Sequence, residues 1–231
     1  ILSMGAVSAV QAQEQVVKIG HTGPLSGPNA FAGKDNENGV RMAIDDLNAK
    51  KLVVGGKTLK FELVSEDDQC DPKACVAVAQ KMTDAGIKYV MGPYCSGVAI
   101  PSSKVYDEGG AILSTVGSNP KVTMGGYKSV FRIIAGDNLV GTTMAQYAVH
   151  TLKAKTAGVI DDRTAFGQGL AEEFIKEAKS LGLTIVGQEY TTDKATDFSA
   201  ILTNIKAKKP DVVFFGGMDA VAGPMLRQMR S

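Results

Sequence analysis

The stretch Gly92-Pro93-Tyr94-Cys95-Ser96-Gly97 lies between a short apolar run, residues 87–91, and an expected helix, residues 98–107. The apolar run predicts a strand. In an open α/β sheet, ligands bind outside the carboxyl ends of the strands, which is where this loop would lie. Its glycines let the backbone approach a ligand, and its serine both donates and accepts hydrogen bonds. We therefore expect it to line a small-molecule pocket.

Two further stretches are expected at the same edge of the sheet. Ser114-Thr115-Val116-Gly117-Ser118-Asn119-Pro120 follows an expected strand at residues 111–114, and it again combines glycine with hydroxyl groups. Cys70-Asp71-Pro72-Lys73 opens a helix, with Asp as the N-cap and Pro at the first helical position. Its cysteine would be available to tie this edge to the stretch that contains Cys95.

Strand and helix patterns alternate along the chain. Residues 34–48 predict a helix, because Val40, Ala43, Ile44 and Leu47 recur at the spacing of one helix face. The expected strands are residues 16–21, 58–65, 87–91, 111–114, 130–134, 157–160, 184–189 and 212–215. A repeat of roughly 20 to 30 residues that contains one strand and one helix predicts βαβ units and a parallel sheet.

The alternation is interrupted near residues 136–139 and then starts again. We therefore expect an α/β fold of two Rossmann-like lobes with parallel sheets: a ligand-binding N-terminal lobe at residues 16–138 and a partial second lobe at residues 139–231. The second lobe would have only about three strands, and residues 225–231 form a helical pattern without a C-cap. These features predict a chain that is truncated at the C-terminus.

Residues 1–12 form an apolar run that ends in the small-x-small triplet Val10-Gln11-Ala12. This pattern predicts the remnant of a secretory signal peptide, and the alternative is a buried strand or helix at a clipped end. The run is too short to span a bilayer, and no cysteine near its end indicates a lipid anchor. We expect an exported protein.

The composition narrows the class of function. The 231 residues are 44% hydrophobic and 21% charged with a net charge of +1, which is ordinary for a globular protein and gives no support to nucleic-acid binding. Export permits one disulfide among Cys70, Cys75 and Cys95. The cysteines lack Cys-x-x-Cys spacing, and both histidines lie far away in the sequence, so we expect no metal site.

We expect no catalysis and no cofactor. Ser118-Asn119-Pro120-Lys121 fits the Ser-x-x-Lys pattern of serine acyl-enzymes, but Pro120 disfavours helix at Asn119, and that mechanism needs Ser and Lys on one helical turn. The sequence contains no Gly-x-Ser-x-Gly, no Gly-x-Gly-x-x-Gly and no Walker loop.

Taken together, the motifs resemble those of the periplasmic branched-chain amino-acid binding proteins of ABC transporters, which have the type I periplasmic binding protein fold. The resemblance extends over residues 16–231. It rests on the order and spacing of segments at residues 17–20, 23–27, 39–48, 67–72, 95–96, 117–120, 166–169, 197–200 and 209–217.

The resemblance implies a set of ligand-binding residues: Tyr94, Cys95, Ser96, Gly117, Ser118, Phe166 and Met218. Ser96 would meet the ligand carboxylate, Gly117 and Ser118 would meet the carboxylate and ammonium, and the other side chains would line the pocket. The alternatives are an N-cap role for Ser96, a simple turn at Ser118, and core packing for Phe166 and Met218. The family's acidic partner for the ammonium would lie beyond Ser231, and we expect Asp219 to cap a helix rather than replace it. The resemblance also implies a Cys70–Cys95 disulfide that leaves Cys75 as a buried thiol.

The function implied is that of a periplasmic, monomeric solute-binding protein. It would deliver branched-chain L-amino acids to an ABC transporter permease when its lobes, joined by three crossing strands, close about residues 136–138. A 231-residue chain without the family's returning C-terminal part would close poorly. Alternatives are a binding protein for a short amide, urea or aromatic acid, or a ligand-sensing module for a receptor.

Overall fold

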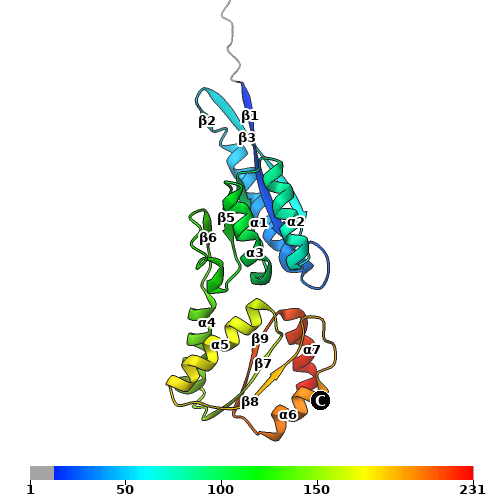
Figure 1. The fold of residues 1–231 in the computed structure, drawn as a ribbon, viewed down its shortest axis with the longest axis vertical. Helices are drawn as coiled ribbons and strands as arrows, with labels where there is room; N and C mark the ends of the chain where they lie inside the picture. Colours follow the sequence, from blue (N-terminus) through cyan, green and yellow to red (C-terminus); the bar gives the residue numbers. More distant parts are fainter. Residues whose placement is uncertain (1–12, 231) are drawn as a thin grey trace, which may run out of the picture.

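Two separate sheets, one of six strands and one of three, organise the part of the chain that the structure describes (Figure 1). The computed structural model describes residues 13–230, and the expected signal-peptide remnant at residues 1–12 lies outside the described residues. We call the part built on the six-stranded sheet the first lobe and the part built on the three-stranded sheet the second lobe. The strands are β1 (Glu14–Gly23), β2 (Val53–Val54), β3 (Lys57–Asp67), β4 (Tyr89–Met91), β5 (Ile112–Thr115), β6 (Val130–Arg132), β7 (Thr156–Asp161), β8 (Thr184–Tyr190) and β9 (Val212–Gly216).

The first sheet has the strand order β2-β3-β1-β4-β5-β6, and all of its pairs are parallel except β2 with β3. The sequence patterns did not predict β2. Its two residues form a hairpin with β3 across Gly55 and Gly56, both of which have positive φ, as tight hairpin turns require. Two residues are too short to show a strand period.

The helices are α1 (Ala30–Ala49), α2 (Pro72–Asp84), α3 (Ser96–Glu108), α4 (Asp137–Gln146), α5 (Ala165–Ser180), α6 (Ser199–Ala207) and α7 (Asp219–Arg230). A short 3-10 helix, η1 (Pro120–Val122), follows β5, and a short π-helix, η2 (Tyr147–Thr151), extends α4. Helix α4 and η2 together form one continuous helical segment over residues 137–151. Among the described residues, no helix is both long enough and apolar enough to cross a membrane.

Strand alternation places helices on both faces of the first sheet. Val90 and Leu113 are fully buried in a core shared with α2 and α3. Their neighbours Met91 and Ser114 point to the opposite face, beside α1. The second sheet follows the same rule: Val159 packs toward α5, and Ile160 packs toward α6 and α7.

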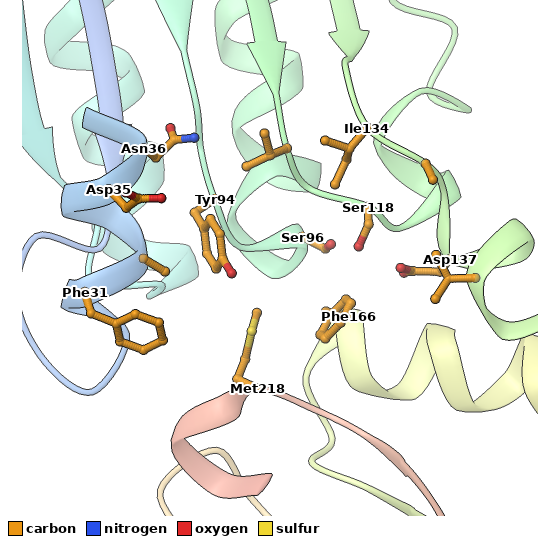
Figure 2. Close-up of a pocket in the computed structure, with 14 residues that line it drawn as sticks. Phe31, Asp35, Asn36, Tyr94, Ser96, Ser118, Ile134, Asp137, Phe166 and Met218 are labelled. Atoms are coloured by element: carbon orange, nitrogen blue, oxygen red, sulfur yellow. The ribbon is translucent and has the colours of Figure 1, made fainter. Parts of the chain in front are cut away.

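The two lobes meet where β6 leads into α4. Helix α4 packs along α5, and Phe174 of α5 stacks on Phe214 of β9 with ring centroids 4.0 Å apart. In this arrangement, the carboxyl ends of β4 and β5 face the second lobe at the beginning of α5 and at the loop that precedes α7 (Figures 1 and 2).

Candidate functional site

A cleft of about 840 Å³ lies between the lobes, at the carboxyl ends of β4 and β5 (Figure 2). This is the position at which open α/β sheets bind ligands. The lining residues come from both lobes: Phe31, Ala32, Asp35, Asn36, Tyr94, Ser96, Val116, Ser118, Ile134, Ala135, Asp137, Val140, Phe166 and Met218.

Ser96 is the first residue of α3, and its side chain faces the cleft (Figure 2). It is only 1% exposed, and its hydroxyl accepts a 3.1 Å hydrogen bond from the Asn119 N–H. Among the described residues, the N–H groups of Ser96 and Gly97 donate to no protein group. Free N–H groups at the positive end of a helix dipole are suited to an anionic ligand group.

Gly117 brings the loop after β5 close to the start of α3. A Cβ atom at this position would lie 2.9 Å from the Ala99 Cβ and 3.4 Å from the Ser96 Cα, so a larger residue would push the two segments apart. The Thr115 hydroxyl accepts from the Gly117 N–H at 2.9 Å and donates to the Pro93 carbonyl at 2.6 Å. These contacts fix Ser118, which is 8% exposed, beside Ser96 at the cleft.

Asp137 lies next to Ser118 and directs its carboxylate into the same end of the cleft (Figure 2). It is the first residue of α4, and its N–H donates to the Ser118 carbonyl at 3.0 Å. The side chain is fully buried, and neither oxygen has a hydrogen-bond partner of good geometry. Burial raises the pKa of Asp137, and the nearby Ser118 hydroxyl opposes this only in part.

The other walls of the cleft are largely apolar. Tyr94 of the first lobe faces Phe166 and Met218 of the second lobe, and Phe31 of α1 stands at the open side, 58% exposed (Figure 2). Burial raises the pKa of the Tyr94 phenol, and the negative charge of Asp219 adds to this, so the ring stays neutral at physiological pH.

Asp162 holds the second-lobe wall in place. One of its carboxylate oxygens accepts from the Thr164 N–H and hydroxyl at 3.0 and 2.6 Å, and the other accepts from the Met218 N–H at 3.2 Å. Thr164 in turn caps α5 by accepting from the Gly167 N–H at 3.0 Å. One buried carboxylate therefore positions both Phe166 and Met218.

The cysteines lie beside this cleft rather than in it. Cys70 and Cys95 form a disulfide, as the resemblance implied, and Cys75 is a buried free thiol that donates to the Val98 carbonyl at 3.1 Å. Burial raises the pKa of Cys75 to about 12. Cys95 and Gly117, which the resemblance also implied, are not among the residues that line the cleft.

Five of the seven ligand-binding residues expected from the sequence line this one cleft: Tyr94, Ser96, Ser118, Phe166 and Met218. Sequence reasoning placed Asp137 only at the hinge and missed Phe31, Asp35 and Asn36. The last three lie on the first turns of α1, and a signal for them was present, since α1 begins after the Gly23-Pro24 turn at the carboxyl end of β1.

The periplasmic binding protein family matches residues 16–231, and the chain belongs to this family. It is 42% identical over 216 residues to a Pseudomonas aeruginosa amino acid binding protein and 38% identical over 216 residues to a Salmonella typhimurium leucine-specific-binding protein. Each alignment covers 93% of this chain, which spans only 57% and 58% of the two relatives.

Solved structures show the same fold. A leucine binding protein from Thermotoga maritima has a TM-score of 0.85 at 26% identity, over 93% of this chain and 60% of that one. A branched-chain amino acid transporter substrate binding protein from Streptococcus pneumoniae, solved with isoleucine, has a TM-score of 0.84 at 26% identity, over 94% of this chain and 61% of that one. The expected α/β fold and the family resemblance are confirmed.

Among residues 13–230, no group of three or more His, Cys, Asp or Glu side chains is arranged to hold a metal ion.

Proposed function

We propose that the protein containing this chain binds a branched-chain aliphatic L-amino acid in the cleft between its lobes and passes it, unaltered, to an ABC transporter permease. The observation that carries the proposal is the combination of polar groups and apolar surface in one cleft. Ser96, Ser118 and the start of α3 form its polar end, and Tyr94, Phe166 and Met218 contribute apolar surface beside these groups. A zwitterion with an aliphatic side chain matches both kinds of surface.

The polar end supports recognition of the main-chain groups of an amino acid. The free N–H groups of α3 and the Ser96 hydroxyl suit a carboxylate, and the Ser118 hydroxyl suits an ammonium as an acceptor. Cys95 and Gly117 would take part through their backbone groups. Charge-assisted hydrogen bonds of this kind favour the zwitterion over neutral amides or urea.

The relatives support the choice of ligand. Proteins that resemble the chain at 36 to 38% identity carry the names leucine-specific-binding and Leu/Ile/Val-binding protein. We infer by the same argument that the protein acts in the periplasm as a monomer, without a nucleic-acid partner, and that residues 16–138 and 139–231 form the two closing lobes. Closure would give the permease a shape that only the loaded protein presents.

The test is isothermal titration of the full-length protein with L-leucine, L-isoleucine and L-valine, followed by acetamide, urea and 4-hydroxybenzoate. We expect saturable binding of at least one of the three amino acids and none of the other compounds. Analysis of the recovered ligand by mass spectrometry should show it unchanged. If acetamide, urea or 4-hydroxybenzoate gave a saturable heat of binding and none of the amino acids did, the assignment of an amino-acid ligand would be wrong.

A further inference from the structure

The buried carboxylate of Asp137 lacks the partner that such a group ordinarily needs. It is fully buried, neither oxygen has a hydrogen bond of good geometry within residues 13–230, and none of the salt bridges among these residues includes it, although the nearby Ser118 hydroxyl lowers its pKa in part. A carboxylate removed from water without compensation is costly, so buried acidic groups are normally paired. The absence of a protein partner in the described region calls for an explanation.

A purely structural role does not provide that explanation. An acidic residue in the first turn of a helix often caps it, but the N–H groups of Leu139 and Val140 bond to the Gly136 carbonyl, and none donates to the Asp137 carboxylate. The positive charge of Arg132 lowers the pKa of Asp137, but its guanidinium donates to the Asn119 carbonyl and the Thr123 hydroxyl. The carboxylate is thus neither a cap nor half of an ion pair.

The direction of the side chain indicates where the partner would be. Asp137 lines the cleft together with Ser118, and its oxygens face the space between Ser118 and Phe166 (Figure 2). In Figure 2, Ser96 at the start of α3, whose free N–H groups suit an anion, lies on one side of Ser118, and Asp137 lies on the other. An α-amino acid carries its cation and its anion on neighbouring groups, so a ligand seated at Ser118 would present an ammonium toward Asp137.

We infer that Asp137 is the first-lobe acceptor for the ammonium group of the ligand, with Ser118 as its neighbour. This inference rests on the proposed function and deepens it, because it assigns charge recognition to a residue at the junction between the lobes. The positive charge of the ammonium would compensate the buried carboxylate. Because water is excluded from the site, the attraction between the two charges is stronger there than in solution. Asp137 acts whether or not a second acid contributes from elsewhere in the full-length protein.

The test compares Asp137→Asn with wild type in titrations with two ligands, L-leucine and (S)-2-hydroxy-4-methylpentanoate. The second compound keeps the carboxylate and side chain of leucine but replaces the ammonium by a neutral hydroxyl. We expect Asp137→Asn to weaken leucine binding by roughly 10- to 100-fold, the scale of a charge-assisted hydrogen bond, and to change hydroxy-acid binding by less than about threefold. Asp137→Ala should show the same selectivity between the ligands.

Asp71→Asn is the matched control, because Asp71 is also a carboxylate at a helix start but lies outside the cleft. It should leave both affinities unchanged. If Asp137→Asn weakened both ligands equally, or neither, the assignment of Asp137 would be overturned while the proposed function stood. If wild type bound no amino acid at all, the proposed function would fail first, and the inference would fall with it.

Discussion

The side-chain amide of Asn119 donates a 2.7 Å hydrogen bond to the main-chain carbonyl of Ala165, which joins the loop after β5 to the first residue of α5. The bond therefore connects the two lobes directly. The same side chain uses its oxygen to accept from the Lys121 N–H at 2.9 Å, which caps η1. Asn119 thus combines a local role with a role between the lobes, and the two roles can be separated.

Asn119→Ser should keep the cap but lose the bond between the lobes, because serine caps helices and is too short to reach Ala165. We expect a larger radius of gyration for the ligand-free protein in X-ray scattering, and a decrease on saturation with leucine. Asn48→Ser is the control, since Asn48 bonds only within the first lobe, to the Phe61 backbone. An unchanged radius for Asn119→Ser, or no decrease with ligand in any variant, would contradict closure about this contact.

Ser118→Ala should weaken leucine binding by about 1.5 to 3 kcal/mol, the range for hydrogen bonds to charged groups. Ser96→Ala should cost at least as much, since it also leaves the buried Asn119 N–H without its acceptor. Ser199→Ala serves as the control, because Ser199 begins α6 and bonds to Asp197, away from the cleft. Titration calorimetry measures all three, and unchanged affinity in both cleft variants would reduce these serines to structural caps.

Gly117→Ala should weaken both folding and binding. The added Cβ would lie 2.9 Å from Ala99, and the backbone must shift to relieve this, at about 1 to 3 kcal/mol for an overpacked site. Gly39→Ala is the opposite case, because Gly39 lies within α1 and an added Cβ there meets nothing within 4 Å. It should stabilise the protein by roughly 0.5 to 1 kcal/mol. Denaturant titration measures the free energy of unfolding of both variants. Equal changes for Gly117→Ala and Gly39→Ala would contradict the packing argument.

The sequence predicted the parts of this site that depend on local pattern. Strand periods ending in Gly92-Pro93 and Thr115-Val116 placed Ser96 and Ser118 at one sheet edge, and the parallel sheet then brought them together. Asp137 could not be assigned a site role in the same way. Its importance comes from burial without a partner, and burial depends on how α4 and α5 pack, which no single stretch of sequence encodes.

The residues of α1 illustrate a second limit. The helical period predicted the apolar face of α1, but it did not identify Asp35 and Asn36 on the first turns of the helix as cleft residues. These residues line the cleft only because β1 ends beside β4 in the strand order. Contacts between elements that are distant in sequence depend on the strand order of the sheet. The hydrophobic period does not predict that order, whereas the family resemblance implied it.

The disulfide and the free thiol should differ in chemistry and in their effect on stability. Peptide mapping without reduction should find Cys70 linked to Cys95, and Cys75 should resist iodoacetamide at pH 8 in the folded protein, because burial raises its pKa to about 12. The double variant Cys70→Ser, Cys95→Ser should lose about 3 kcal/mol of stability, as expected for a loop of this length. Cys75→Ala is the control for thiol removal, and rapid labelling of native Cys75 would refute its assignment as a buried thiol.

Asp137 should make the ligand-free protein less stable, in contrast to its proposed benefit for binding. Its pKa is raised by burial, because the folded state penalises the charged form, which the unfolded state solvates. We expect Asp137→Asn to raise the stability of the ligand-free protein at pH 7 by about 1 to 3 kcal/mol, the cost of an unsatisfied buried group. Such a gain in stability at the expense of affinity is typical of binding sites.

The effect of Asp137→Asn on stability should depend on pH. Between the unfolded pKa of 3.8 and the raised folded pKa, the folded state holds a proton that the unfolded state does not, so acidification through this window stabilises wild type. The advantage of Asp137→Asn should therefore shrink as the pH falls from 7 through the folded pKa. Asp71, whose pKa is lowered by the Ala74 and Lys73 N–H groups, has the opposite sign: its contribution is present above 3.8 and is lost as the pH falls through its folded pKa. Thermal unfolding of ligand-free wild type, Asp137→Asn and Asp71→Asn across this pH range measures both effects. If Asp137→Asn were less stable than wild type at pH 7, the Asp137 carboxylate would have a stabilising partner in the folded protein.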